Sequence, residues 1–176
     1  MTSKWLALLI CSILAGFIGL TAGQAKEPKK DDAAFADSRR ASQRGLEPFN
    51  DWVGTWKGTG QPKRMSSKGA WTEEAEWAWM LAKGSAGLEI KVKDGKLLVE
   101  GVLSYDPDQK KFRFAGKLPG DESRAYVGDR EDKAKLVPVS TDDQTKVQHR
   151  LTFQMLHPDR LLLLAETKPA GQSNFS

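Results

Sequence analysis

From about residue 55 to the end of the chain, apolar and polar residues alternate over short segments, as they do in half-buried β-strands. The clearest case lies at 88–93, where Leu88, Ile90 and Val92 share one face and alternate with charged residues. This pattern predicts strands over nine ranges: 55–60, 70–82, 88–93, 96–105, 111–118, 124–128, 134–139, 146–155 and 160–167.

Tight-turn residues separate the predicted strands. Asp94-Gly95 predicts a two-residue hairpin turn, because both residues tolerate positive φ, and His157-Pro158-Asp159 predicts the turn of the last hairpin. No long helical segment intervenes that could carry a parallel crossover. We therefore expect an all-β fold, an antiparallel up-and-down barrel of about 8–10 strands, with a β-sandwich as the alternative.

A short apolar segment precedes the first strand. Leu46, Phe49 and Val53 recur at helical spacing, Pro48 suits the first turn of a helix, and Gly54 interrupts the pattern. This segment predicts a helical plug of one or two turns that closes one mouth of the barrel.

The sequence Trp52-Val53-Gly54-Thr55-Trp56, at the head of the predicted meander, resembles the Gly-x-Trp start of lipocalin-like (calycin) barrels, including uncharacterised bacterial secreted proteins with that fold. The resemblance covers the chain from about Leu46 onward and implies a cup with an internal pocket for a small apolar molecule. Such chains usually carry one more strand after the position of 160–167. We expect a barrel domain at 46–176 that either lacks its last strand or belongs to a fragment, with an open edge that favours association.

The N-terminal residues predict export. Lys4 precedes an apolar run at 5–20, and Gly23 and Ala25 are small residues suited to a cleavage site, so 1–25 is interpreted as a secretory signal peptide. An uncleaved anchor is the alternative, because the run is near the lower limit for a membrane span. Residues 26–45 are polar and charged and are interpreted as a tether, either disordered or a short helix over 33–44. The expected location is periplasmic or extracellular, with no membrane attachment after signal cleavage.

Composition excludes several kinds of chemistry. Cys11, inside the predicted signal peptide, is the only cysteine, so the mature chain would hold neither disulfides nor thiolate ligands. The formal net charge of +4 comes from interspersed acids and bases, which does not indicate a nucleic-acid partner. The two histidines have no metal-site spacing, and no Gly-x-Ser-x-Gly segment is present. We expect no catalytic activity, no metal and no cofactor.

Side chains predicted by parity to face the interior form the candidate ligand site. Nine are proposed: Trp56, Trp77, Trp79, Ile90, Tyr105, Phe112, Phe114, His149 and Phe153. Glu73 shares the parity of the tryptophans. The same aromatic residues would equally form a plain core.

His149 is the least expected inward residue, because its parity neighbours Val147, Leu151 and Phe153 are apolar. It is interpreted either as a hydrogen-bonded core histidine or as a haem ligand, since the glycine-rich first strand is similar to that of nitrobindin-like haem barrels. The expected function is binding of a small hydrophobic ligand. The alternatives are a haem-binding nitrobindin-like barrel that uses His149, and a ligand-free structural or interaction module of the cell envelope.

Overall fold

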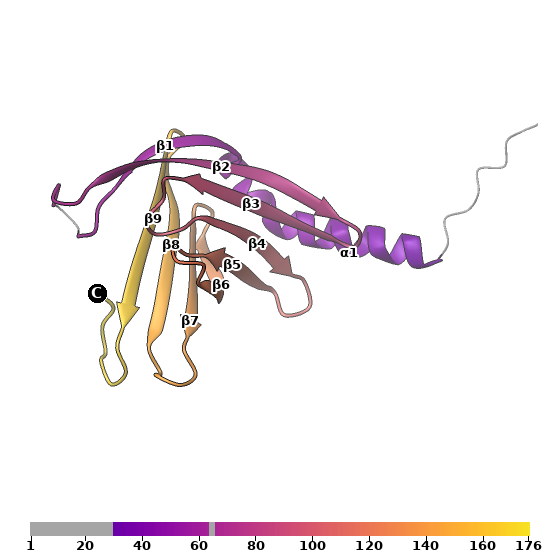
Figure 1. Cartoon of the computed structure of the whole chain (residues 1–176). Coiled ribbons are helices and arrows are strands. Elements are labelled where there is room, and N and C mark those ends of the chain that lie inside the picture. The colour runs from indigo at the N-terminus through magenta and orange to yellow at the C-terminus, as the bar shows by residue number, and fades with distance from the viewer. Residues whose placement is uncertain (1–29, 64–65) are drawn as a thin grey trace, which may run out of the picture.

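The structure is a computed structural model that describes residues 30–63 and 66–176 (Figure 1). The predicted signal peptide therefore lies outside the described residues. The elements are α1 (Lys30–Leu46), the 3₁₀ helix η1 (Glu47–Trp52), β1 (Gly54–Gly60), β2 (Trp71–Ala82), β3 (Ser85–Lys93), β4 (Glu100–Asp106), β5 (Lys111–Lys117), β6 (Ser123–Asp132), β7 (Lys135–Thr141), β8 (Gln148–His157) and β9 (Arg160–Lys168).

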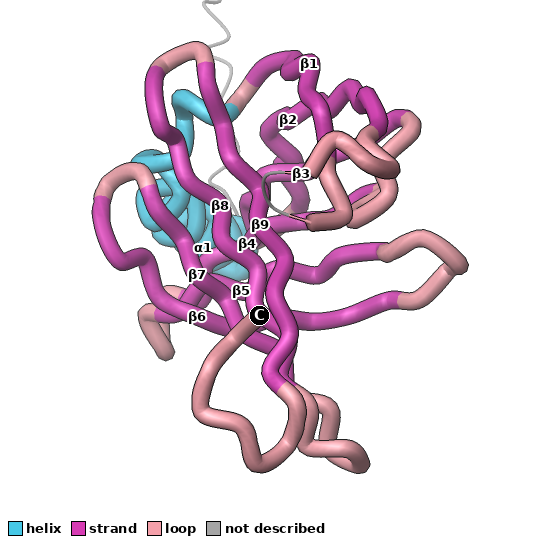
Figure 2. Tube along the Cα trace, turned by 90° about the vertical axis from the view of Figure 1, so that its left-hand side faces the viewer, coloured by secondary structure: helices cyan, strands magenta, loops and turns pink. Residues whose placement is uncertain are grey.

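The nine strands form one sheet in which each strand pairs antiparallel with its neighbours in the chain. The sheet curls round on itself into a nearly closed barrel (Figure 1, Figure 2). This confirms the predicted all-β up-and-down barrel with a short N-terminal helical plug. Within the described residues β1 pairs with β2 and β9 with β8, but β1 and β9 do not pair with each other. We call the gap between these two edges the seam.

The plug faces the core with a different residue from the one that the sequence predicted. Leu46, Phe49 and Trp52 are buried, whereas Val53 is 39% exposed. The assumption of α-helical spacing was wrong, because η1 is a 3₁₀ helix with three residues per turn. Every third residue then faces the same way, which brings Trp52 to the core and turns Val53 outward.

Aromatic side chains fill the interior above the plug. The Trp52 ring lies 4.4 Å from Phe49 and 5.4 Å from Trp77, and Phe153 lies 5.7 Å from Trp77 and 5.0 Å from Phe114, all between ring centroids. Such pairs contribute about 0.5–1.5 kcal/mol each beyond the area they bury. The barrel therefore has a packed core that joins the plug to both halves of the sheet.

α1 is longer than the predicted helix over 33–44, and it packs against β3 and β4. Near its N-terminus, Phe35 lies against Gly84 in the β2–β3 turn, and the Lys83 ammonium lies 4.8 Å from the centre of the Phe35 ring. Near its C-terminus, Gly45 lies against the ring of Tyr105 so closely that a Cβ atom there would be 2.1 Å from the ring. Close approach at both ends fixes the helix along these strands.

The connection between β3 and β4 is longer than predicted. The hairpin is present, but the two-residue turn at Asp94-Gly95 was wrong, because β3 ends at Lys93 and β4 begins only at Glu100. The intervening residues bury Leu98 in the core, and the chain closes through a hydrogen bond from the Val92 N–H to the Val99 carbonyl oxygen at 2.7 Å. Burial of an apolar side chain therefore outweighs the shortest turn.

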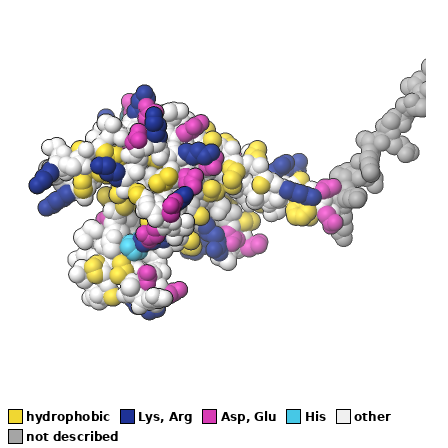
Figure 3. All heavy atoms as spheres, in the orientation of Figure 1, with side chains coloured by type: hydrophobic (Ala, Val, Ile, Leu, Met, Phe, Trp, Pro, Cys, Tyr) yellow, Lys and Arg dark blue, Asp and Glu magenta, His cyan; other side chains and the backbone are white. Residues whose placement is uncertain are grey.

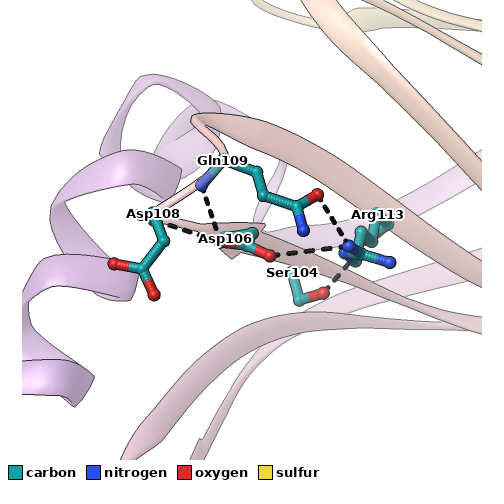
Figure 4. A network of polar contacts seen from close by, with 5 residues as sticks. All are labelled: Ser104, Asp106, Asp108, Gln109 and Arg113. Carbon is teal, nitrogen blue, oxygen red and sulfur yellow. Dashed lines mark hydrogen bonds and ion pairs between the residues drawn. The ribbon is translucent and has the colours of Figure 1, made fainter.

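The turn between β4 and β5 is held by one carboxylate (Figure 4). Asp106 accepts hydrogen bonds from the backbone N–H groups of Asp108 at 3.1 Å and Gln109 at 3.0 Å, and Arg113 lies 3.5 Å from the same carboxylate. The bond from the Gln109 N–H is the main reason that the pKa of Asp106 lies below its ordinary value. These contacts are all internal to the hairpin, so we assign this network to turn stability.

Candidate functional site: a cleft along the seam

A cleft of about 920 Å³ lies along the seam. Residues 56–63, from β1 and the loop after it, form one wall, and residues 159–166, from the β8–β9 turn and β9, form the other. The cleft is also lined by inward side chains of β2, β3 and β8, which include Trp77, Ile90 and Phe153. Its volume falls within the range of about 300–1,000 Å³ that is usual for small-molecule sites.

The β1 wall is nearly bare, because glycine occupies most of its inward positions. Trp56 shares its parity with Gly54, Gly58 and Gly60. A Cβ atom at Gly58 would meet only the Glu73 side chain, at 3.9 Å, so the space beside it is open. The space at Gly60 is instead filled by the indole of Trp71. Room for a ligand on this side therefore lies next to Gly58.

The β9 wall is a run of four leucines. Leu161 and Leu163 pack against the core, whereas Leu162 and Leu164 face outward and are 37% and 38% exposed. The inward position of these leucines was not predicted, because a continuous apolar run has no alternation that marks which residues face the core. The register of the last hairpin, in which Leu163 pairs with Phe153, settles which of them face inward.

The structure brings part of the predicted ligand site together. Four of the nine predicted residues line the cleft: Trp56, Trp77, Ile90 and Phe153. Another four pack in or against the core without lining it: Trp79, Tyr105, Phe112 and Phe114. A ligand-binding role for any of the nine stays a prediction.

His149, the ninth, shares the parity of the inward residues of β8 but is not among the residues that line the cleft. It is half-buried, and its Nδ1 atom lies 3.5 Å from the Thr167 hydroxyl oxygen. Burial lowers its pKa and Arg124 lowers it further, against smaller opposing effects of Glu122 and Asp142. Among the residues that the structure describes, no three histidine, cysteine or acidic side chains gather as they would around a metal ion.

Two carboxylates at the cleft have partners within the protein. Glu73 lines the cleft, as its parity predicted, and its carboxylate accepts a hydrogen bond from the Trp71 indole N–H at 2.6 Å. Glu166 accepts from the Arg150 guanidinium at 2.8 Å. These carboxylates are committed to the protein, and the cleft lining combines apolar side chains with basic ones such as Lys63 and Arg160.

One buried donor at the cleft has no acceptor. Trp77 is 1% exposed, and its indole N–H makes no hydrogen bond within the described part of the chain. An unsatisfied buried donor costs about 1–3 kcal/mol. A ligand oxygen that reached this N–H would recover that cost.

The fold thus belongs to the class of nearly closed antiparallel barrels with a helical plug. No protein-family model matches the chain, and searches of curated proteins and of solved structures also find no match. Over the described ranges, no helix combines the length and the apolar character that crossing a membrane requires. Acidic and basic side chains are mixed on the face that Figure 3 shows.

Proposed function

We propose that this protein is an exported, non-catalytic binding protein with a lipocalin-like barrel, and that it holds a small apolar ligand in the seam cleft. The observation that carries the proposal is the cleft itself, which runs between two unpaired strand edges and is lined by Trp56, Leu161 and Leu163. Three further large side chains from the core, Trp77, Ile90 and Phe153, also line it. The aromatic core fills the space between plug and sheet, so the seam rather than the barrel centre is where we expect the ligand.

Apolar burial supplies the main driving force in this proposal. A ligand that buries about 300 Å² of apolar surface gains about 7.5 kcal/mol at the usual 25 cal/mol per Å². Lost translational and rotational freedom offsets part of this gain. The unpaired indole N–H of Trp77 favours ligands that also carry an oxygen acceptor, such as a carboxylate or an ester.

Gly58→Leu tests the site. A Cβ atom at this position has only the Glu73 side chain within 4 Å, so we expect the barrel to keep its stability while the leucine side chain fills part of the cleft. We expect fatty acids of graded chain length to quench tryptophan fluorescence in the wild type, and Gly58→Leu to weaken binding by about tenfold or more.

Thr55→Leu is the matched control, because Thr55 is exposed on the same strand and lies outside the cleft lining. It should bind as the wild type does. Native mass spectrometry and an absorption spectrum of protein from its own source would show whether an apolar molecule or haem accompanies it. Failure of all apolar probes to bind, or equal binding by Gly58→Leu, would contradict the proposal.

A further inference from the structure

The edge of β9 already accepts the start of another strand. After β9 the chain turns back beside it (Figure 1). The Thr167 N–H donates to the Ser176 carbonyl oxygen at 2.9 Å, and the Ser176 N–H donates to the Thr167 carbonyl oxygen at 3.0 Å. Two residues that exchange both bonds form the hydrogen-bonded pair of an antiparallel ladder. Ser176 also lines the cleft, so this pair lies at the seam.

The pair at Thr167 fixes which backbone groups of β9 face the seam. Backbone groups in a strand alternate between the two neighbouring sides. Because Thr167 directs its N–H and C=O into the seam, Ala165, Leu163 and Leu161 direct theirs the same way. Within residues 30–63 and 66–176 these three residues have no strand partner on that side. The cleft wall is therefore a row of free backbone donors and acceptors.

Strand direction favours one more strand rather than direct closure. In a meander of nine antiparallel strands, β1 and β9 run in the same direction. If they met across the seam they would pair in parallel, which is slightly less stable per residue. A strand that runs antiparallel to β9, as Ser176 does at Thr167, is antiparallel to β1 as well. A single added strand can thus make the favourable pairing on both sides.

Side chains around the seam define what such a strand should carry. On the interior side, Gly58 leaves open space and Leu163 presents apolar surface, so inward side chains should be large and apolar. On the outer side, Leu162 and Leu164 are exposed on the strand edge. No charged side chain lies between them to prevent pairing with another strand. A segment with apolar residues at alternate positions matches the interior side.

We propose that the seam binds an extended segment of a partner polypeptide, which adds as a strand antiparallel to β9 and directs alternate apolar side chains into the cleft. This inference rests on the proposed function and names its ligand class: the apolar groups are side chains of a peptide. Free backbone groups along the whole wall favour a peptide over a lipid, because a lipid tail leaves them unsatisfied.

The test uses a nine-residue peptide, as long as β9, with valine at odd positions and threonine or glutamate at even positions. Amide hydrogen exchange is followed by NMR on the full chain. We expect the peptide to slow exchange at Leu161, Leu163 and Ala165 by about tenfold or more. The control is the same peptide N-methylated at alternate residues, which removes the donors of one edge and should not give this protection.

If the free peptide binds too weakly to be detected, the same sequence is fused to the chain after Ser176. The fusion raises the effective concentration of the peptide into the millimolar range. If neither the free nor the joined peptide protects these amides while a fatty acid still binds, strand addition is overturned and the proposed function stands. If fatty acid and peptide both fail, both are overturned. If the same amides are protected in a dimer that forms without peptide, the proposal of a partner peptide is overturned, and the seam binds a second copy of the chain instead.

Discussion

The indole N–H of Trp56 donates a hydrogen bond to the backbone carbonyl oxygen of Trp52 at 2.8 Å. Trp52 ends the plug and Trp56 lies in the first strand, so this bond joins the two elements across the bend at Gly54. The φ angle of Gly54 is +140°, in a region that residues with a side chain rarely adopt. The Gly-x-Trp sequence therefore encodes both the bend and the bond that holds it.

Trp56→Phe should destabilise the barrel by about 1–2 kcal/mol, because it removes this hydrogen bond and part of the ring contact. Urea unfolding gives the free energy. Trp79→Phe is the matched control, since Trp79 packs against the same core but makes no hydrogen bond through its indole within the described residues. An equal loss in both variants would show that ring size, and not the bond to Trp52, sets the cost.

Gly45→Ala should destabilise the docking of α1. Alanine favours a helix over glycine by about 0.5–1 kcal/mol, but its Cβ would lie 2.1 Å from the Tyr105 ring, and overpacking costs about 1–3 kcal/mol. The ring cannot move freely, because it packs against Phe112 at 5.0 Å between centroids. We therefore expect the steric clash to outweigh the gain in helix propensity. Comparing the free energy of unfolding of Gly45→Ala in the wild-type and Tyr105→Ala backgrounds measures the cost of the clash. Equal effects in the two backgrounds would contradict the prediction.

Asp106→Asn should flatten the acid limb of the stability profile. The pKa of Asp106 lies below its ordinary value of 3.8, so its contribution is present above that value and is lost as pH falls through the lower folded pKa. Unfolding measured across this range should show a steeper loss in the wild type. Asp108→Asn is the control, because Asp108 contributes its backbone N–H, which the substitution keeps.

His149→Leu should reduce the loss of stability in mild acid. Burial lowers the pKa of His149 below 6.5, so the unfolded chain binds the proton more readily. Its contribution is complete above about pH 6.5 and is lost as pH falls through the lower folded pKa. Thermal unfolding from about pH 7 to about pH 5 should therefore be flatter in the variant. His157→Gln, at an exposed turn, is the control, and the same flattening there would contradict this assignment.

Much of the sheet was predictable because one physical rule acts along it. A strand with one buried face alternates, so Leu88 and Ile90 mark both the position of β3 and its inward face. Each of the nine predicted ranges overlaps a strand, although β4 begins four residues later than predicted and β6 ends four residues later. The predicted two-residue turn at Asp94-Gly95 was wrong, because the turn preference of these two residues stabilises the fold less than the burial of Leu98, which requires a longer connection.

The cleft was harder to predict, because register depends on more than spacing. Counting back from the last turn, where His157 pairs with Arg160, would pair Phe153 with Leu164. A β-bulge between Met155 and His157 shifts the pairing by one residue, so that Leu163 faces inward instead. Parity also cannot separate core from cleft: Trp77 and Phe114 both face inward, but only Trp77 lies near the seam.

The pairing of Ser176 with Thr167 has a practical consequence for handling the protein. A purification tag or fluorescent label fused to Ser176 begins inside the seam and would occupy the cleft. α1 projects away from β9 (Figure 1), so attachment ahead of Lys30 leaves that surface free. If the proposed ligand binds at the seam, attachment to a sensor chip through Ser176 should weaken binding and attachment ahead of Lys30 should not.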